Sequence, residues 1–178
     1  IELAMTSDQV LEEVFPLPER LAVVGAGYIG LELASILNAL GSKTTLILRG
    51  DLPLRGFEQD LRRHLAVEVE AHGVSLWNET VVDRLEAAHG CVRLHTSRGA
   101  LQVDRVIYAT GRSSRPQTAS LGLEPHGVRL HPTGTIAVDA EYRSSNPAIF
   151  AVGDCCDHAG TALDGVPFDL TPVAIAEG

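Results

Sequence analysis

The pattern G-x-G-x-x-G at residues 25–30 constrains the fold of this chain more than any other sequence feature. It follows a short apolar run at residues 21–24, and it precedes apolar residues that recur at helical spacing as far as Leu40. A second run of β-formers occupies residues 44–48. This order predicts a strand, a tight turn, a helix and a second, parallel strand, which together make a βαβ unit.

The three glycines of the pattern each have a physical role in a nucleotide-binding turn. Gly25 permits the tight turn, Gly27 lets the backbone approach a pyrophosphate, and Gly30 lets the helix pack closely on the strand. The first helical turn, with Tyr28 and Ile29, offers free amides and the positive end of the helix dipole to phosphates. The context favours dinucleotide binding, and the alternative is an ordinary strand-to-helix turn.

The residue after the second strand indicates which dinucleotide would bind. A carboxylate there would bind the ribose 2′-hydroxyl of NAD, but this chain has Arg49, and Arg55 follows six residues later. Guanidinium groups complement a 2′-phosphate, so the two arginines predict NADP. Gly30 is mild support for NAD, because NADP sites often have alanine there. The alternative is that both arginines are solvated loop charges, and we expect the nearby Arg62 and Arg63 to form an exposed helix face.

The pattern that follows predicts an α/β fold. A helical period covers residues 57–72 and a short strand is expected at 74–76, after which the period changes to two. Residues 79–103 therefore predict a three-stranded antiparallel β-meander, and residues 106–109 predict another buried strand. The expected architecture is a Rossmann-like parallel sheet that carries this meander.

Both ends of the sequence have weaker patterns. Residues 6–15 predict a short helix capped by Ser7 or Asp8, and residues 149–152 resemble a buried strand. Thr171 would cap a final helix that stops after under two turns, and the sequence begins with Ile rather than Met. These features lead us to expect a piece of a longer protein.

Five short motifs, spread over nearly the whole chain, indicate a resemblance to a known protein family. They are residues 25–32 (GAGYIGLE), Arg49 with residues 54–57 (LRGF), residues 109–112 (ATGR), residues 151–154 (AVGD) and residues 170–174 (LTPVA). In this order and rough spacing they resemble the glutathione reductase family, whose members are FAD- and NADPH-dependent pyridine nucleotide–disulfide oxidoreductases. The resemblance implies an NAD(P)-binding domain at residues 16–140, a linker or FAD-domain piece at 1–15, and a partial FAD-domain segment at 141–178.

The resemblance also implies roles for individual residues around NADPH. Tyr28 would be the ring that covers the nicotinamide pocket and swings aside, and Glu32 would face the nicotinamide and pair with a flavin-side lysine outside this chain. The remaining contacts would come from the arginines at the 2′-phosphate and from the residues that line the cleft, namely Arg49, Arg55, Gly111 and Arg112.

On the flavin side, the resemblance implies that Asp154 hydrogen-bonds the FAD ribityl chain and that the Thr171 region lies near the flavin ring. The implied reaction is hydride transfer from NADPH to FAD, followed by electron transfer to a disulfide substrate, with the redox chemistry supplied by the cofactors. The complete enzyme would be a cytoplasmic homodimer.

Several family features are missing from this sequence. It has no G-x-G-x-x-G for the FAD adenosine, no pair of cysteines separated by four residues, and no C-terminal dimerisation domain, and residues 155–169 make an unusually long link before Thr171. We therefore expect the isolated chain to be inactive and assign it no catalytic residue. A stand-alone NAD(P)-binding module without catalysis is the main alternative. A reductase of the Tyr-x-x-x-Lys type is disfavoured, because no such pair occurs.

Composition excludes some other classes. The net charge of −9 argues against a nucleic-acid-binding surface, and no apolar run approaches the roughly 20 residues that span a bilayer. Cys91, Cys155 and Cys156 cannot form the disulfide framework of a small secreted protein. The run Asp154-Cys155-Cys156-Asp157-His158 contains metal-ligand residue types, but adjacent cysteines rarely reach one ion, so we expect no metal site.

Overall fold

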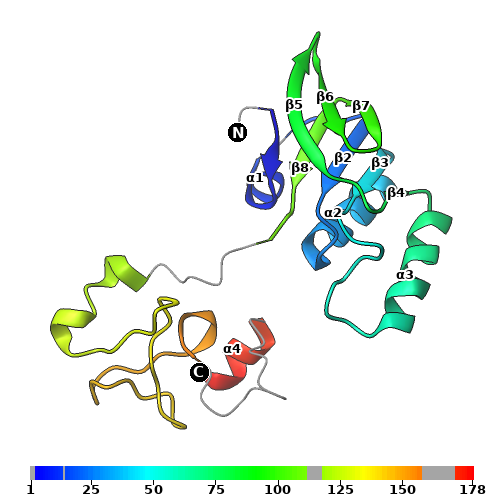
Figure 1. Cartoon of the computed structure of the whole chain (residues 1–178). Helices are drawn as coiled ribbons and strands as arrows, with labels where there is room; N and C mark the ends of the chain where they lie inside the picture. Colours follow the sequence, from blue (N-terminus) through cyan, green and yellow to red (C-terminus); the bar gives the residue numbers. More distant parts are fainter. Residues whose placement is uncertain (1–2, 14, 112–117, 158–170) are drawn as a thin grey trace. The chain divides into compact units, whose positions relative to one another are not determined.

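The structure, a computed structural model, describes residues 3–13, 15–111, 118–157 and 171–178, and it divides into two compact units. The first unit comprises Ile1–Arg112 and the second comprises Ser113–Gly178 (Figure 1). These units differ from the ranges 1–15, 16–140 and 141–178 expected from the sequence. The first unit includes the N-terminal segment because that segment adds a strand to its sheet.

The first unit is built on a five-stranded parallel sheet, and the sequence predicts four of its strands. Its strand order is β1-β8-β2-β3-β4, and each neighbouring pair is parallel. The strands are β1 (Met5–Thr6), β2 (Arg20–Val24), β3 (Lys43–Ile47), β4 (Ser75–Trp77) and β8 (Arg105–Tyr108). The predicted α/β class with a parallel sheet and a separate antiparallel sheet is confirmed.

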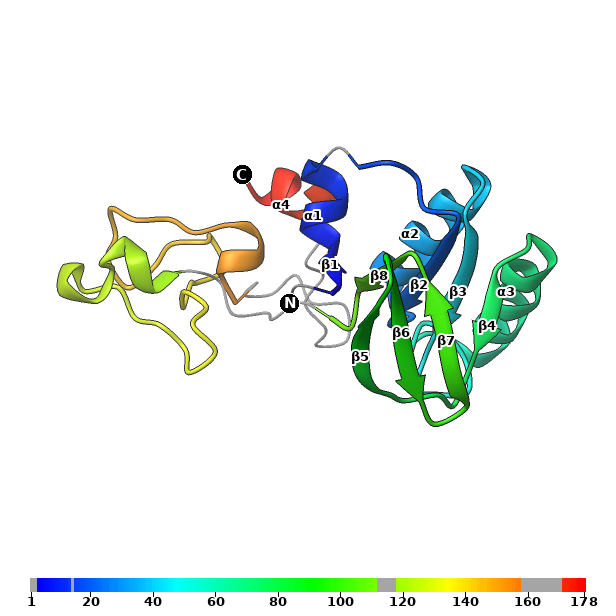
Figure 2. The same ribbon diagram turned by 90° about the horizontal axis from the view of Figure 1, so that it is seen from above.

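Both faces of the parallel sheet are covered, which explains why its central strand β2 is apolar from Leu21 to Val24. Leu21 and Val23 of β2 pack toward the helices, in one cluster with residues of α2 (Tyr28–Ala39) and α3 (Gln59–Ala71). Ala22 and Val24 pack in a second cluster with residues of the antiparallel sheet (Figure 2). That sheet consists of β5 (Val82–Ala88), β6 (Cys91–Thr96) and β7 (Gly99–Val103), in the order β5-β6-β7.

The N-terminal segment differs from its prediction in its cap and in its pairing. The helix α1 spans Ser7–Glu12, and its cap is Thr6, not Ser7 or Asp8. The Thr6 hydroxyl accepts a bond from the Gln9 amide at 3.3 Å, while the Gln9 side chain accepts one from the Thr6 amide at 2.9 Å. This reciprocal capping box satisfies two free amides of the first turn. Met5 and Thr6 also pair with Ile107 and Tyr108 of β8.

The second unit has a small core and isolated β-bridges. Its buried apolar cluster is Val128, Ile136, Ala151 and Cys156. The strand expected at residues 149–152 is wrong: among the described residues of this segment, Phe150 makes one isolated bridge to Arg143 and is 56% exposed. Short 3₁₀ helices occur at η1 (Thr118–Leu121), η2 (Glu124–His126) and η3 (Gly153–Cys155), and α4 spans Thr171–Glu177.

In the parts of the chain that the structure describes, no helix is both long enough and apolar enough to cross a membrane.

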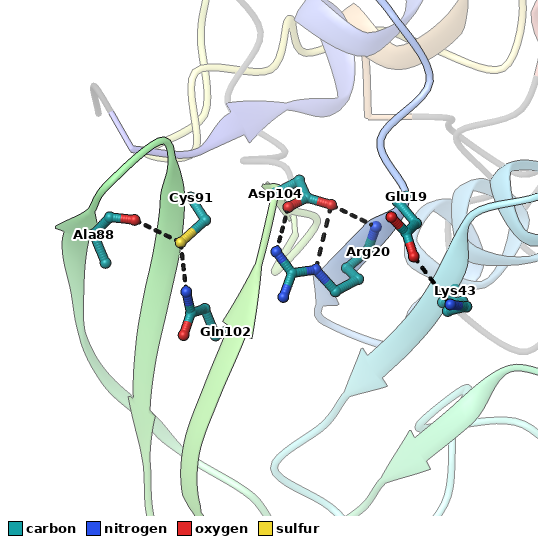
Figure 3. Close-up of polar contacts among 7 residues, drawn as sticks. All are labelled: Glu19, Arg20, Lys43, Ala88, Cys91, Gln102 and Asp104. Atoms are coloured by element: carbon teal, nitrogen blue, oxygen red, sulfur yellow. Dashed lines mark hydrogen bonds and ion pairs between the residues drawn. The ribbon is translucent and has the colours of Figure 1, made fainter.

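An ion pair joins the amino ends of two neighbouring strands, β2 and β8 (Figure 3). The Arg20 guanidinium lies 2.6 Å from Asp104 Oδ1, and the Arg20 amide donates to Asp104 Oδ2 at 2.8 Å. The Asp104 amide in turn donates to the Arg20 carbonyl at 2.9 Å. These hydrogen bonds from Arg20, and its positive charge, hold the pKa of the Asp104 carboxyl below its usual value. In the same region, Cys91 Sγ donates to the Ala88 carbonyl at 2.6 Å.

We expect Asp104→Asn to lower Tm at pH 7 by a few degrees, because the variant loses the charge of a partly shielded ion pair. Since the folded pKa of Asp104 lies below the unfolded value of about 3.9, the ion pair stabilises the fold above about pH 4. Its contribution is lost as the pH falls through the folded pKa. Thermal unfolding of both proteins at pH values from 7 to 2.5 should therefore show the difference in Tm shrinking at the acid end.

The matched control for this prediction is Glu19→Gln. Glu19 pairs with Lys43 at 3.0 Å, but both side chains are more than two-thirds exposed, so the variant should leave Tm unchanged. An equal loss of stability in the two variants would contradict a special role for the Arg20–Asp104 pair.

Candidate functional site

The candidate site lies at the carboxyl ends of β2, β3 and β8. From β2 the chain continues to β3 and β4 on one side, whereas β8 adds on the other side of β2. The boundary between β2 and β8 is therefore the point where the strand order reverses, which is where open α/β sheets bind their ligands. Three predicted segments meet there: the glycine turn after β2, the arginine loop after β3 and residues 109–111 after β8.

The glycine turn packs against the end of β8 with no space for a side chain. Gly25 has a φ of +108°, and a Cβ on it would clash with the backbone carbonyl of Ala109. A Cβ on Gly30 would clash with the carbonyl oxygen of Gly25. The Ala109 amide donates to the Val24 carbonyl at 2.8 Å, so the contact is part of the sheet. Gly25 and Gly30 are thus required by the fold itself.

Gly27 differs from the other two glycines, because neither its backbone nor its packing requires the absence of a side chain. Its φ is −72°, it is exposed, and a Cβ there would have no atom of the described residues within 4 Å. It is the N-cap of α2 and makes no side-chain capping bond. The first helical bond runs from the Leu31 amide to the Gly27 carbonyl at 3.0 Å, so the amides before Leu31 remain available to a ligand.

Tyr28, Ile29 and Glu32 divide between two faces of α2. Tyr28 is 56% exposed and Glu32 is exposed one turn later on the same face, since residues i and i+4 align on a helix. Ile29 is half-buried and packs against the apolar cluster between the parallel sheet and the helices α2 and α3. Its side chain therefore has a structural role, and only its amide belongs to the candidate site.

The arginine loop is tied to its surroundings through its backbone. The Leu54 amide donates to the Ala26 carbonyl at 2.9 Å, which joins the loop directly to the glycine turn. The Glu79 amide donates to the Gly50 carbonyl at 2.8 Å, which holds the start of the loop. Leu54 itself has a φ of +51° and packs against the apolar cluster between the parallel sheet and the helices α2 and α3. The two predicted nucleotide-binding segments thus lie together.

Arg49 and Arg55 are both exposed at this edge of the sheet. Within residues 3–13 and 15–111, neither guanidinium makes an ion pair, whereas Arg62 pairs with Asp51 and Arg63 pairs with Asp60 at 2.9 Å. The expectation that Arg62 lies on an exposed face is wrong, because its side chain is only 15% exposed. Charge alone could not distinguish these arginines in the sequence.

The other predicted site residues follow β8 or lie in the second unit. Gly111 is exposed with a φ of +129°, and Arg112 lies outside the described residues. Asp154 is exposed in η3, and Thr171 is exposed at the first position of α4. The Gly153 amide donates to the Glu177 carboxylate at 2.7 Å, so η3 and α4 are held together.

The two adjacent thiols bond to different carbonyl groups. Cys155 Sγ donates to the Val152 carbonyl at 3.2 Å, and Cys156 Sγ donates to the Gly153 carbonyl at the same distance. In the described segments, no three side chains of the ligand types His, Cys, Asp and Glu converge as a metal site would require.

The sequence analysis missed two residues that shape this site, Leu54 and Arg62. Leu54 connects the arginine loop to the glycine turn, and Arg62 holds the loop from α3. The only signal for Leu54 was its position in the LRGF motif. No sequence signal separated Arg62 from Arg63.

Comparisons with known proteins agree with this geometry. A family model described as pyridine nucleotide-disulphide oxidoreductase matches residues 3–178. Glutathione reductase of Burkholderia cepacia is 40% identical over 178 residues, which are 99% of this chain but 37% of that protein. The chain therefore spans little more than a third of the length of this relative.

Two solved structures are also similar. One is a Cu(II) complex of the HOCl-induced flavoprotein disulfide reductase RclA from Escherichia coli, with a TM-score of 0.80, 28% identity, and coverage of 98% of this chain and 38% of that chain. The other is an engineered water-forming NADPH oxidase bound to NADPH, with a TM-score of 0.65, 31% identity, and coverage of 84% of this chain and 31% of that chain.

The glycine turn yields a direct stability prediction. Gly25→Ala should lower the free energy of unfolding by about 2–4 kcal/mol, because the new Cβ both opposes a positive φ and clashes with the Ala109 backbone. Gly27→Ser should change it by less than about 0.5 kcal/mol, because serine is a favoured N-cap residue and the space is open. Urea denaturation of the two variants measures the contrast, and equal losses would contradict it.

Proposed function

The chain belongs to the pyridine nucleotide-disulphide oxidoreductase family, and on that premise we propose that it is the NADPH-binding portion of a flavoprotein disulfide reductase similar to glutathione reductase. The observation that carries the proposal is the meeting of the glycine turn with two exposed arginines at the reversal point of the sheet. The family membership supports an oxidoreductase, and the residues of this edge support the choice of nucleotide.

The preference for NADPH over NADH rests on charge at the arginine loop. The position after the second strand of the βαβ unit is Arg49 rather than a carboxylate, so no negative charge there repels a 2′-phosphate. Arg49 and Arg55 have no carboxylate partner among the described residues of the first unit, which leaves both guanidinium groups available. Each guanidinium could donate two hydrogen bonds to phosphate oxygens.

The engineered NADPH oxidase supports the same assignment. In that protein an aspartate is replaced and two arginines six positions apart are introduced, with a replaced glycine nineteen positions before the first of them. Arg49 and Arg55 have the same separation of six, and Gly30 lies nineteen positions before Arg49. The match is limited to the two arginines and to the position of the glycine, because Gly30 remains glycine here and the neighbours of Arg49 are Leu48 and Gly50.

The residues of this chain fit the rest of the dinucleotide. The open space at Gly27 and the amides at the start of α2 would receive the pyrophosphate, with the helix dipole favouring its negative charge. Tyr28 and Glu32, exposed on one face of α2, would lie at the nicotinamide. Gly111 and Arg112 would line the same cleft. When bound, NADPH supplies the hydride that FAD accepts.

The flavin-side residues and the substrate belong to the complete protein. Asp154 and Thr171 would contact FAD, and the cysteine pair that reduces the disulfide would come from outside this chain. We therefore propose that the chain alone has no disulfide reductase activity, that glutathione disulfide is the substrate of the complete enzyme, and that this enzyme is a cytoplasmic homodimer.

One observation favours a second candidate, a nucleotide-binding module without catalysis. The sequence has only three cysteines, and none of them forms a pair separated by four residues. A Cys-x4-Cys pair upstream in the parent gene would favour the reductase, and its absence would favour the module.

Replacement of both arginines should remove the preference for NADPH. The variant Arg49→Ala with Arg55→Ala should bind NADPH at least about 100-fold more weakly, because charge-assisted bonds contribute about 1.5–3 kcal/mol each. NADH affinity should change less than threefold, since NADH has no 2′-phosphate. Isothermal titration of both nucleotides measures the ratio. Equal affinity of the unmodified chain for NADPH and NADH would overturn the assignment.

Substitution of Gly27 tests the pyrophosphate subsite independently of the arginines. Gly27→Ser should weaken NADPH and NADH by the same factor, about tenfold or more, because its side chain fills space that the pyrophosphate needs. Since the fold does not need glycine there, the loss should come without loss of stability. Unchanged affinity for both nucleotides would place the pyrophosphate elsewhere.

A further inference from the structure

Arg62 reaches from the first turns of α3 to the backbone of the arginine loop. Its Nε donates to the Pro53 carbonyl at 2.7 Å, and its Nη2 donates to the Leu52 carbonyl at 2.9 Å. The same Nη2 lies 3.4 Å from Asp51 Oδ1. The side chain is 15% exposed, so these bonds are largely shielded from water. The Nε and Nη2 groups of Arg62 therefore both donate to the backbone of the arginine loop.

The contacted carbonyls lie between the two arginines that the proposed function assigns to the 2′-phosphate. Backbone bonds hold the loop at Gly50 and at Leu54, and Arg62 holds residues 51–53 between those points. No residue of this described stretch pairs in a β-ladder, since β3 ends at Ile47. Its path, and with it the separation of the flanking guanidinium groups, depends on the Arg62 bonds and on one longer bond of 3.4 Å from the Asn78 side chain to the Asp51 carbonyl.

Arg62 also pairs with Asp51, the carboxylate that lies between the two phosphate-binding candidates in the sequence. Asp51 is the only acidic residue in residues 49–56. A carboxylate in this loop would otherwise compete with a 2′-phosphate for Arg49 and Arg55, since both anions prefer the same guanidinium donors. The Arg62–Asp51 contact reduces that competition.

We propose that Arg62 is a positioning residue for nucleotide specificity: it makes no contact with the dinucleotide but orders the loop that presents Arg49 and Arg55 to the 2′-phosphate. The inference rests on the proposed NADPH function. It depends on a guanidinium more than on positive charge alone, because two nitrogens of one rigid fork donate to consecutive carbonyls, which the single nitrogen of an ammonium group reproduces only in part.

The test compares Arg62→Met and Arg62→Lys with Arg63→Met. Arg63 is the matched control, because it has the same charge on the same helix, is 57% exposed and, among the described residues, pairs only with Asp60. Arg62→Met should weaken NADPH about tenfold, as expected for the loss of one charge-assisted interaction, with NADH affinity changed less than twofold. Arg62→Lys should recover part of the loss, and Arg63→Met should bind both nucleotides normally.

A double-mutant cycle separates positioning from general electrostatics. If Arg62 acts through Arg49 and Arg55, Arg62→Met should cause no further loss of NADPH affinity in the variant that lacks both arginines. An additive further loss would show direct or long-range action of Arg62 and would overturn the proposal. Hydrogen exchange should also show faster exchange of the Leu54 amide in Arg62→Met than in Arg63→Met.

The remaining outcomes distinguish this inference from the proposed function. If the unmodified chain prefers NADPH and the double arginine variant loses that preference, but Arg62→Met keeps it, the proposed function stands and the role of Arg62 is wrong. If Arg62→Met weakens NADPH and NADH equally, the residue supports the fold rather than specificity, which also overturns the role. If the unmodified chain does not distinguish the nucleotides, both proposals fail.

Discussion

The close contact between the glycine turn and the end of β8 is the constraint on which the rest of the first unit depends. Gly25 and Gly30 remove two side chains from a place where the ends of β2, α2 and β8 converge. Without that convergence, α2 could not lie against the sheet at this angle, and the segments after β2 and β8 would not be neighbours. The same backbone then brings the arginine loop alongside through the bond between Leu54 and Ala26.

Local sequence patterns were sufficient to predict the parallel sheet and the meander, because each has a distinct hydrophobic period. The glycine turn was also predictable, since its spacing has a steric cause that the structure displays. What the sequence could not show were contacts between distant positions. The pairing of Met5 with Ile107 joins residues about one hundred positions apart, and no periodicity signals such a partner. The expected strand at residues 149–152 failed because apolar residues without a neighbouring ladder do not define a strand.

The sequence predicted only part of the candidate site, because contacts between side chains are also not visible in the sequence. Residue types indicate what a side chain could bind, but not which side chains are already engaged. Arg49, Arg55, Arg62 and Arg63 carry the same charge, yet Arg62 and Arg63 bond to carboxylates or carbonyls of the chain. Among the described residues of the first unit, five of the ten cations make an ion pair with a carboxylate. Arg49 and Arg55 are two of the five that do not, and their position beside the glycine turn distinguishes them from the other three.

The ion pair of Arg20 and Asp104 lies at the amino ends of β2 and β8, whereas the candidate site lies at their carboxyl ends. The five residues of β2 span about 17 Å, which exceeds the screening length of about 8 Å at physiological ionic strength. The charges of this pair are therefore largely screened from the other end of the sheet. Protonation of Asp104 weakens the fold with little effect on the field at the nucleotide edge, so this contribution to acid stability is separate from the affinity for a nucleotide.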